Sequence, residues 1–198
     1  LNASLWVDYY YLDTEERRRF AQVSHEYLIE QLQFTGSESA SKLNHRLNFN
    51  HPVKELIWVE HPAYIVSEFE FNPQFRYNTC NKAKLQLNGH DRFSERDGSY
   101  FTLVQPYQHH TTVPIKQTIN YLTELGPNSY TYNKSIHVYS FGFTPENHQP
   151  SGTCNMSRID NATLSITPNE TTSEIYIYAV NYNVLRVMGG MAGLAYSN

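Results

Sequence analysis

Residues 143–164, FTPENHQPSGTCNMSRIDNATL, change character midway and so limit the folds open to this chain. The first half contains Pro145, Pro150 and Gly152, which break regular backbone hydrogen bonding and indicate an irregular loop of fixed shape. From Ile159 to Leu164 the side chains alternate, which indicates a return to extended structure. A rigid polar crossover between strands is typical of one end of a Greek-key or jelly-roll sandwich.

Period-two alternation, the pattern of a strand with one buried face, recurs along the chain. It is clearest in residues 43–50, where His45 is expected to be a core histidine, and it returns in residues 83–90 and 175–188. Residues 53–59 form a further strand, in which Trp58 is a candidate core anchor. The residues expected to form the core are Trp58, Leu47, Phe49, Leu85, Leu87, Phe141 and Tyr178.

Other segments are less regular but are still informative. Residues 136–143 are apolar on both faces, which predicts a central strand, and Leu5–Leu12 has the aromatic and β-branched composition of a strand. Asp13 begins a capping-box-like run, which predicts a short helix. Residues 61–81 are expected to be a long insertion. The pattern therefore predicts an all-β, antiparallel jelly-roll sandwich of about eight strands, with short helices and long loop insertions.

The composition excludes several classes of protein. Only 17% of the residues are charged, whereas sixteen are tyrosine, which favours a half-buried β protein that contacts other proteins. The net charge of −4 and the lack of a long basic tract argue against direct nucleic-acid binding. No apolar run is long enough to predict membrane insertion. The chain begins at Leu1 without a methionine, so it is expected to be a fragment.

The sequence contains no recognisable catalytic motif. Cys80 and Cys154 are expected to be reduced structural thiols, because neither lies in a setting that would lower a thiol pKa. His109 and His110 are the only adjacent histidines, and neighbours on a strand point to opposite faces. There is no G-x-S-x-G elbow and no phosphate-binding loop. We therefore predict no enzyme activity, and we assign no catalytic, cofactor-binding or metal-binding residue.

Four segments in chain order resemble the major capsid protein of nucleocytoplasmic large DNA viruses. They are LDTEERRRFAQVSHEYLIEQLQ, HPVKELIWV, HQPSGTCNMSRIDNATL and the final IYAVNYNVLRVMGGMAGLAYSN, and QPYQHHTTVP resembles the family as well. The resemblance favours strand over helix for residues 25–34, where the periodicity alone is ambiguous. It implies two consecutive jelly rolls per subunit, with residues 1–198 as the single C-terminal jelly-roll domain and the N-terminal one absent from this chain.

The same resemblance implies a structural function. The expected protein self-assembles into homotrimeric, pseudo-hexagonal capsomers of an icosahedral virion shell, built in the host cell cytoplasm. Its expected partners are copies of itself, neighbouring capsomers and minor capsid proteins. The candidate subunit contacts are Asp13–Arg19, His61–Asn81 and Pro145–Gly152.

Two other functions remain open on the sequence. A jelly-roll carbohydrate-binding module would stack exposed aromatic rings on sugars, but Trp6 and Trp58 both lie in strand-like patterns that favour the core. A trimeric signalling ligand of the tumour-necrosis type would need a secretory signal, and none is visible.

Overall fold

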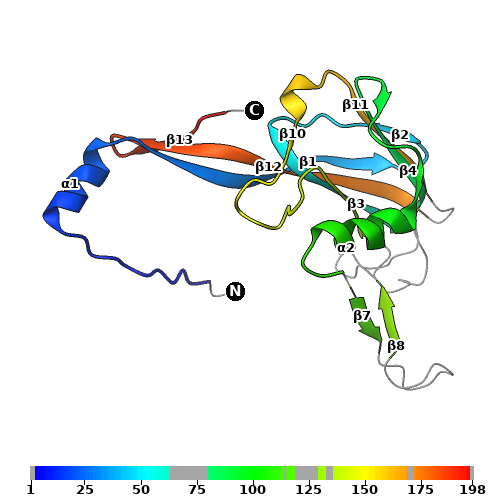
Figure 1. Ribbon diagram of the computed structural model, residues 1–198, viewed down its shortest axis with the longest axis horizontal. Helices are drawn as coiled ribbons and strands as arrows, with labels where there is room; N and C mark the ends of the chain where they lie inside the picture. Colours follow the sequence, from blue (N-terminus) through cyan, green and yellow to red (C-terminus); the bar gives the residue numbers. More distant parts are fainter. Residues whose placement is uncertain are drawn as a thin grey trace. The chain divides into compact units, whose positions relative to one another are not determined.

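A computed structural model describes residues 3–62, 80–113, 115–118, 129–132, 136–168 and 172–196 (Figure 1). The chain divides into two compact units. Unit 1 comprises Leu1–Ile29 and Asn183–Asn198, and unit 2 comprises Glu30–Tyr182.

The helical and extended segments follow one another in this order: α1 (Thr14–Gln22), β1 (His25–Ser39), β2 (Asn44–Arg46), β3 (Pro52–Pro62), β4 (Cys80–Leu87), β5 (His90–Asp91), β6 (Arg96–Asp97), the π-helical η1 (Tyr100–Val104), α2 (Gln105–His109), β7 (Ile115–Thr118), β8 (Ser129–Tyr132), β9 (Ile136–Ser140), β10 (Cys154–Asn155), the 3-10 turn η2 (Met156–Arg158), β11 (Ala162–Pro168), β12 (Thr172–Met188) and β13 (Met191–Leu194). Strands dominate the described residues, which confirms the predicted all-β class.

The strands form two larger antiparallel sheets and one small ribbon. The first sheet has the order β1-β12-β3-β10, with β13 paired to β12 and β9 paired to β3. The second has the order β2-β11-β4-β5, with β6 paired to β4. The ribbon pairs β7 with β8. Two sheets agree with the predicted sandwich, whereas the count of eight strands stays a prediction.

The hydrophobic core of unit 2 is built from residues two apart on facing strands, since alternate side chains of a strand point to one face. Trp58 is fully buried on β3, and its ring meets that of Phe101 edge to face at 5.0 Å. The strands β4, β11 and β12 supply further buried side chains: Ala83, Leu85, Ala162, Leu164, Ile166, Ile175, Ile177 and Ala179. The predicted core residues Leu47 and Phe49 are buried, and Leu87 and Phe141 pack partly buried against the cluster.

The loop after Phe141 and the strand that follows it are as predicted. No helix or strand is assigned between β9 and β10, and extended structure returns at β11. Gly152 adopts φ +146°, and a Cβ there would lie 3.0 Å from the Phe141 carbonyl oxygen. The glycine is therefore required by both backbone conformation and close approach.

Three strand predictions need correction. Residues 25–34 are strand, as predicted, but β1 continues through Gly36 and ends only at Ser39. The alternation from Leu43 shortens to β2, and Leu43 itself is exposed. The β9 strand is not central, because among the described strands it pairs with β3 alone.

Short helices help to bury β9, which has no second strand beside it among the described residues. The backbone N–H of Ser140 donates a 3.0 Å hydrogen bond to the side-chain oxygen of Gln105, at the start of α2. That side chain satisfies a β9 amide that a neighbouring strand would otherwise have to satisfy. A strand that is apolar on both faces can thus be covered by a helix instead of by a second strand.

Two further expectations are wrong. Leu5–Leu12 is irregular and exposed rather than a strand, because β propensity needs neighbouring strands and cover to act on. Tyr178 lies outside the core, where its ring stacks on Phe34 at 4.7 Å. The inward face of β12 instead carries Ile177, Asn181 and Asn183.

Candidate functional site

Among the described residues, most of the large apolar side chains that are exposed belong to unit 1. Trp6 is 91% exposed and Tyr11 is 96% exposed. The other exposed large apolar residues of unit 1 are Leu5, Val7, Tyr9, Tyr10, Leu12, Phe20, Val23, Tyr27, Met188, Met191, Leu194 and Tyr196. None of the described apolar residues in unit 1 is buried. Exposed apolar side chains at this density are typical of a protein interaction surface.

The helix α1 of unit 1 has a well-formed start. The Asp13 carboxylate accepts a 2.8 Å hydrogen bond from the Glu16 backbone N–H, as the capping-box-like sequence predicted. At its other end the Val23 N–H donates to the Arg19 carbonyl at 3.0 Å. Every residue of α1 is exposed. The predicted contact segment Asp13–Arg19 is therefore an accessible, capped helix.

Strands of unit 1 are held by polar contacts rather than by a core. Arg186 on β12 donates from two guanidinium nitrogens to Glu26 Oε1, at 2.8 and 2.6 Å. Asn183 donates from its side-chain amide to the Tyr196 carbonyl at 2.9 Å. Exposed pairs of this kind fix local geometry but add little stability. Unit 1 is ordered locally, and its apolar residues remain available to a partner.

A two-glycine turn joins β12 to β13 in unit 1. Gly189 and Gly190 adopt φ +58° and +80°, the left-handed conformations that a two-residue hairpin turn requires. Met188 pairs with Met191 across this turn, and both side chains are exposed. Every residue of this hairpin from Met188 to Leu194 is exposed.

The Pro145–Gly152 contact candidate lies in unit 2, in a loop that is held at both ends. The Thr144 N–H donates to the Ser151 hydroxyl at 2.9 Å, and the Tyr182 hydroxyl donates to the Asn147 carbonyl at 3.4 Å. Phe143, just before this segment, is 79% exposed. The loop thus presents a fixed surface with an exposed ring beside it.

His110 connects this loop to the sheet. Its imidazole hydrogen-bonds to the Glu55 carboxylate on β3, and the carboxylate of Glu146 in the loop lies 3.8 Å away. The hydrogen bond to Glu55 raises the pKa of His110. The neighbouring His109 contacts the Phe143 carbonyl instead, at 3.0 Å, so the two histidines serve different partners.

The remaining contact candidate, His61–Asn81, falls mostly outside the described residues. Its ends do not belong to an insertion, because β3 continues through His61 to Pro62 and β4 begins at Cys80.

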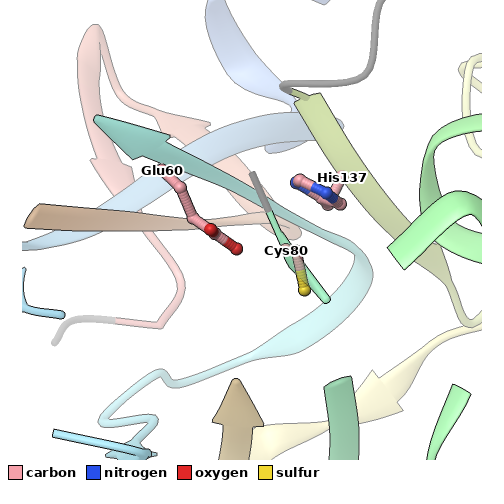
Figure 2. Close-up of side chains that lie close together, drawn as sticks. All are labelled: Glu60, Cys80 and His137. Carbon is pink, nitrogen blue, oxygen red and sulfur yellow. The ribbon is translucent and has the colours of Figure 1, made fainter. Parts of the chain in front are cut away.

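A buried cluster that the sequence did not predict lies in unit 2. Glu60 on β3, Cys80 on β4 and His137 on β9 each offer a ligand atom, and these atoms lie within 4.8 Å of one another (Figure 2). All three side chains are buried. Burial and the Glu60 charge raise the pKa of the Cys80 thiol, which is a free, buried cysteine. Three residue types that bind metal ions therefore meet inside the protein.

No local sequence signal marks this cluster. A metal site is recognisable in a sequence when its ligands are closely spaced, whereas these three residues come from three separate strands. The fold alone brings them together.

Among the described helices, none has the length and apolar character needed to cross a membrane.

Comparison with known proteins places the fold and the family. The model of the large eukaryotic DNA virus major capsid protein family matches residues 16–193. The chain is 58% identical to the major capsid protein of Pyramimonas orientalis virus, over 100% of this chain and 49% of that protein. It therefore spans about half the length of the curated relatives it matches.

Solved structures agree with the sequence match. The crystal structure of PBCV-1 VP54 aligns with a TM-score of 0.69 and 36% identity, over 95% of this chain and 55% of that one. A chain of the quasi-atomic PBCV-1 virus capsid aligns with a TM-score of 0.67 and 36% identity, over 95% and 55%. These likenesses confirm the predicted jelly-roll class. Because the family model and the relative both cover nearly the whole chain, this protein belongs to the large eukaryotic DNA virus major capsid protein family.

Proposed function

We propose that this protein is a structural subunit of the icosahedral shell of a large DNA virus, with no reaction to catalyse. In this proposal residues 1–198 form the C-terminal jelly roll of a two-barrel subunit. Three subunits make a pseudo-hexagonal capsomer, which contacts neighbouring capsomers and minor capsid proteins in the virion. Assembly takes place in the host cell cytoplasm, without direct contact of this domain with nucleic acid.

The observation that carries this proposal is the exposed apolar surface of unit 1. A subunit that assembles into a shell exposes the apolar side chains of its interfaces until neighbouring subunits bind. Trp6 and Tyr9–Tyr11 provide wide, rigid rings, the residue types that dominate interface energies. We take the occupant of this surface to be a second copy of the protein, because obligate shell contacts are large and apolar. Family membership supports the same assignment.

The exposed Trp6 is also compatible with the carbohydrate-binding alternative, since an accessible ring can stack on a sugar. Such a site would leave Leu5, Val7 and Leu12 without cover, because sugars offer few apolar surfaces of that extent. The aliphatic neighbours therefore favour a protein partner. A glycan array on the complete protein would show binding only under the alternative.

The direct test uses sedimentation velocity and negative-stain electron microscopy of the complete protein. The wild type is expected to form trimers that appear as hexagonal particles. The triple variant Tyr9→Ser/Tyr10→Ser/Tyr11→Ser should weaken association about tenfold or more, because interface aromatics carry much of the binding energy. The circular dichroism spectrum of its dissociated chain should match that of the wild type, since these rings are exposed in the described unit.

Tyr107→Ser is the matched control. Tyr107 is 79% exposed on α2 of unit 2, so this variant removes an exposed tyrosine outside the proposed surface. We expect it to assemble as the wild type does. A triple variant that assembles normally would overturn the assignment of the surface, and a monomeric wild type would overturn the function.

A further inference from the structure

We propose that Glu60, Cys80 and His137 form a buried binding site for a divalent metal ion of the zinc type, which joins the two sheets of the sandwich. This site would be separate from the proposed assembly surface, whose residues belong to unit 1.

The geometry brings the three ligands together from both sheets. Glu60 and His137 belong to the paired strands β3 and β9 of one sheet, where His137 is opposite Trp58. Cys80 begins β4 of the other sheet, where it pairs with Pro168. Figure 2 shows the three side chains close together. An ion held by all three would therefore bridge the two sheets.

The spacing is compatible with tetrahedral coordination. The ligand atoms lie within 4.8 Å of one another. Ligand bonds of about 2.0–2.3 Å place the atoms around zinc roughly 3.3–3.5 Å apart, so binding requires a contraction of about 1.5 Å at most. Rotation of the Glu60 and Cys80 side chains can supply a movement of that size without a change in the strands.

The donor set selects the class of ion. A thiolate, an imidazole and a carboxylate together suit Zn²⁺ and its borderline neighbours such as Co²⁺. Mg²⁺ and Ca²⁺ prefer oxygen ligands alone, so they are poor candidates. Three protein ligands leave a fourth tetrahedral position for a small molecule such as water.

Charge favours an ion in this position. With Cys80 ionised, the Glu60 carboxylate and the Cys80 thiolate would carry two negative charges, which a divalent cation neutralises. Without an ion the thiol keeps its proton, because burial and Glu60 raise its pKa. Binding would form the sulfur–metal bond and release that proton to solvent. Burial lowers the pKa of His137 to about 3, so its imidazole is already neutral, the form that binds metal.

The surroundings hold the imidazole in place. The His137 ring stacks on the Trp58 indole at 5.5 Å with an interplanar angle of 13°. The His137 side chain also hydrogen-bonds to the backbone of Trp58. In metal sites, a hydrogen bond from the histidine nitrogen that does not bind the metal fixes the orientation of the ring. The Phe101 ring packs edge to face on Trp58, and both side chains are fully buried.

The experiment measures metal in the complete protein purified without chelator, by inductively coupled plasma mass spectrometry. About one zinc per chain is expected after reconstitution, with release of about one proton per ion near neutral pH. Replacement by Co²⁺ should give a thiolate-to-cobalt charge-transfer absorption in the near ultraviolet. Cys80→Ser should abolish this band.

Cys154→Ser is the matched control, since Cys154 is a free cysteine whose pKa is also raised by burial. It should keep both the metal and the charge-transfer band. The wild-type measurement decides the question even if Cys80→Ser fails to fold. Less than about a tenth of an equivalent of zinc after reconstitution, with no cobalt band, would overturn the site. A band lost in Cys154→Ser but kept in Cys80→Ser would overturn the ligand assignment.

Discussion

Unit 2 and unit 1 place their apolar side chains in opposite ways. Unit 2 stacks two sheets, and residues such as Trp58 and Leu85 are fully buried between them. Unit 1 has a capped helix, strand ends and a hairpin, and none of its described apolar side chains is buried. The difference indicates that unit 2 is stabilised by its own core, whereas the apolar side chains of unit 1 are the ones that the proposed assembly would cover.

The only two tryptophans of the chain give the largest test of this comparison. Trp58→Ala should lower the free energy of unfolding by about 3–5 kcal/mol, because it removes a fully buried ring and leaves a cavity. Trp6→Ala should cost less than about 0.5 kcal/mol in the dissociated protein, because Trp6 is 91% exposed. Urea unfolding of both variants measures the difference. A loss below about 1 kcal/mol for Trp58→Ala would show that the core is described wrongly.

Two glycines give a smaller contrast between the units. Gly152→Ala should cost about 1–3 kcal/mol, because φ +146° strains any other residue and the new Cβ would crowd the Phe141 carbonyl oxygen. Gly193→Ala in unit 1 should change stability by less than about 0.5 kcal/mol, since nothing lies within 4 Å of the new Cβ. Thermal unfolding of the two variants is the measurement. Equal losses of stability in the two variants would contradict the contrast between a tightly packed loop and an open hairpin.

The smallest effect concerns pH and belongs to unit 2 alone. The hydrogen bond to Glu55 raises the folded-state pKa of His110 above the ordinary value of 6.5. The stabilisation is therefore complete below the unfolded-state value and is lost as the pH rises through the folded-state pKa. We expect the unfolding free energy to fall across that window, and to fall less in His110→Asn. Identical pH profiles for the two proteins would argue against this contact.

Sequence patterns predicted unit 2 well because apolar and polar side chains alternate along a strand that has one buried face. Leu85 and Ala83 were assigned to one face, and that face is buried. The assignment failed for Tyr178, because the buried face of β12 includes the asparagines Asn181 and Asn183. Polar residues inside a sheet leave no hydrophobic signal, so the aromatic face looked like the inner one.

Unit 1 and the buried cluster were harder to predict for different reasons. Leu5–Leu12 has the composition of a strand, but the described structure gives it no strand to pair with. The capping residue Asp13 was predictable, because its hydrogen bond spans only three residues. The meeting of Glu60, Cys80 and His137 depends on how two sheets align, which no local spacing encodes.

Hydrogen–deuterium exchange of the complete protein, compared between its dissociated and assembled states, tests the difference between the units most directly. Residues 3–29 and 183–196 should exchange rapidly when dissociated and gain protection on assembly, whereas the core strands β3, β4 and β11 should be protected in both states. Unit 1 segments that exchange at the same rate in both states would contradict the account.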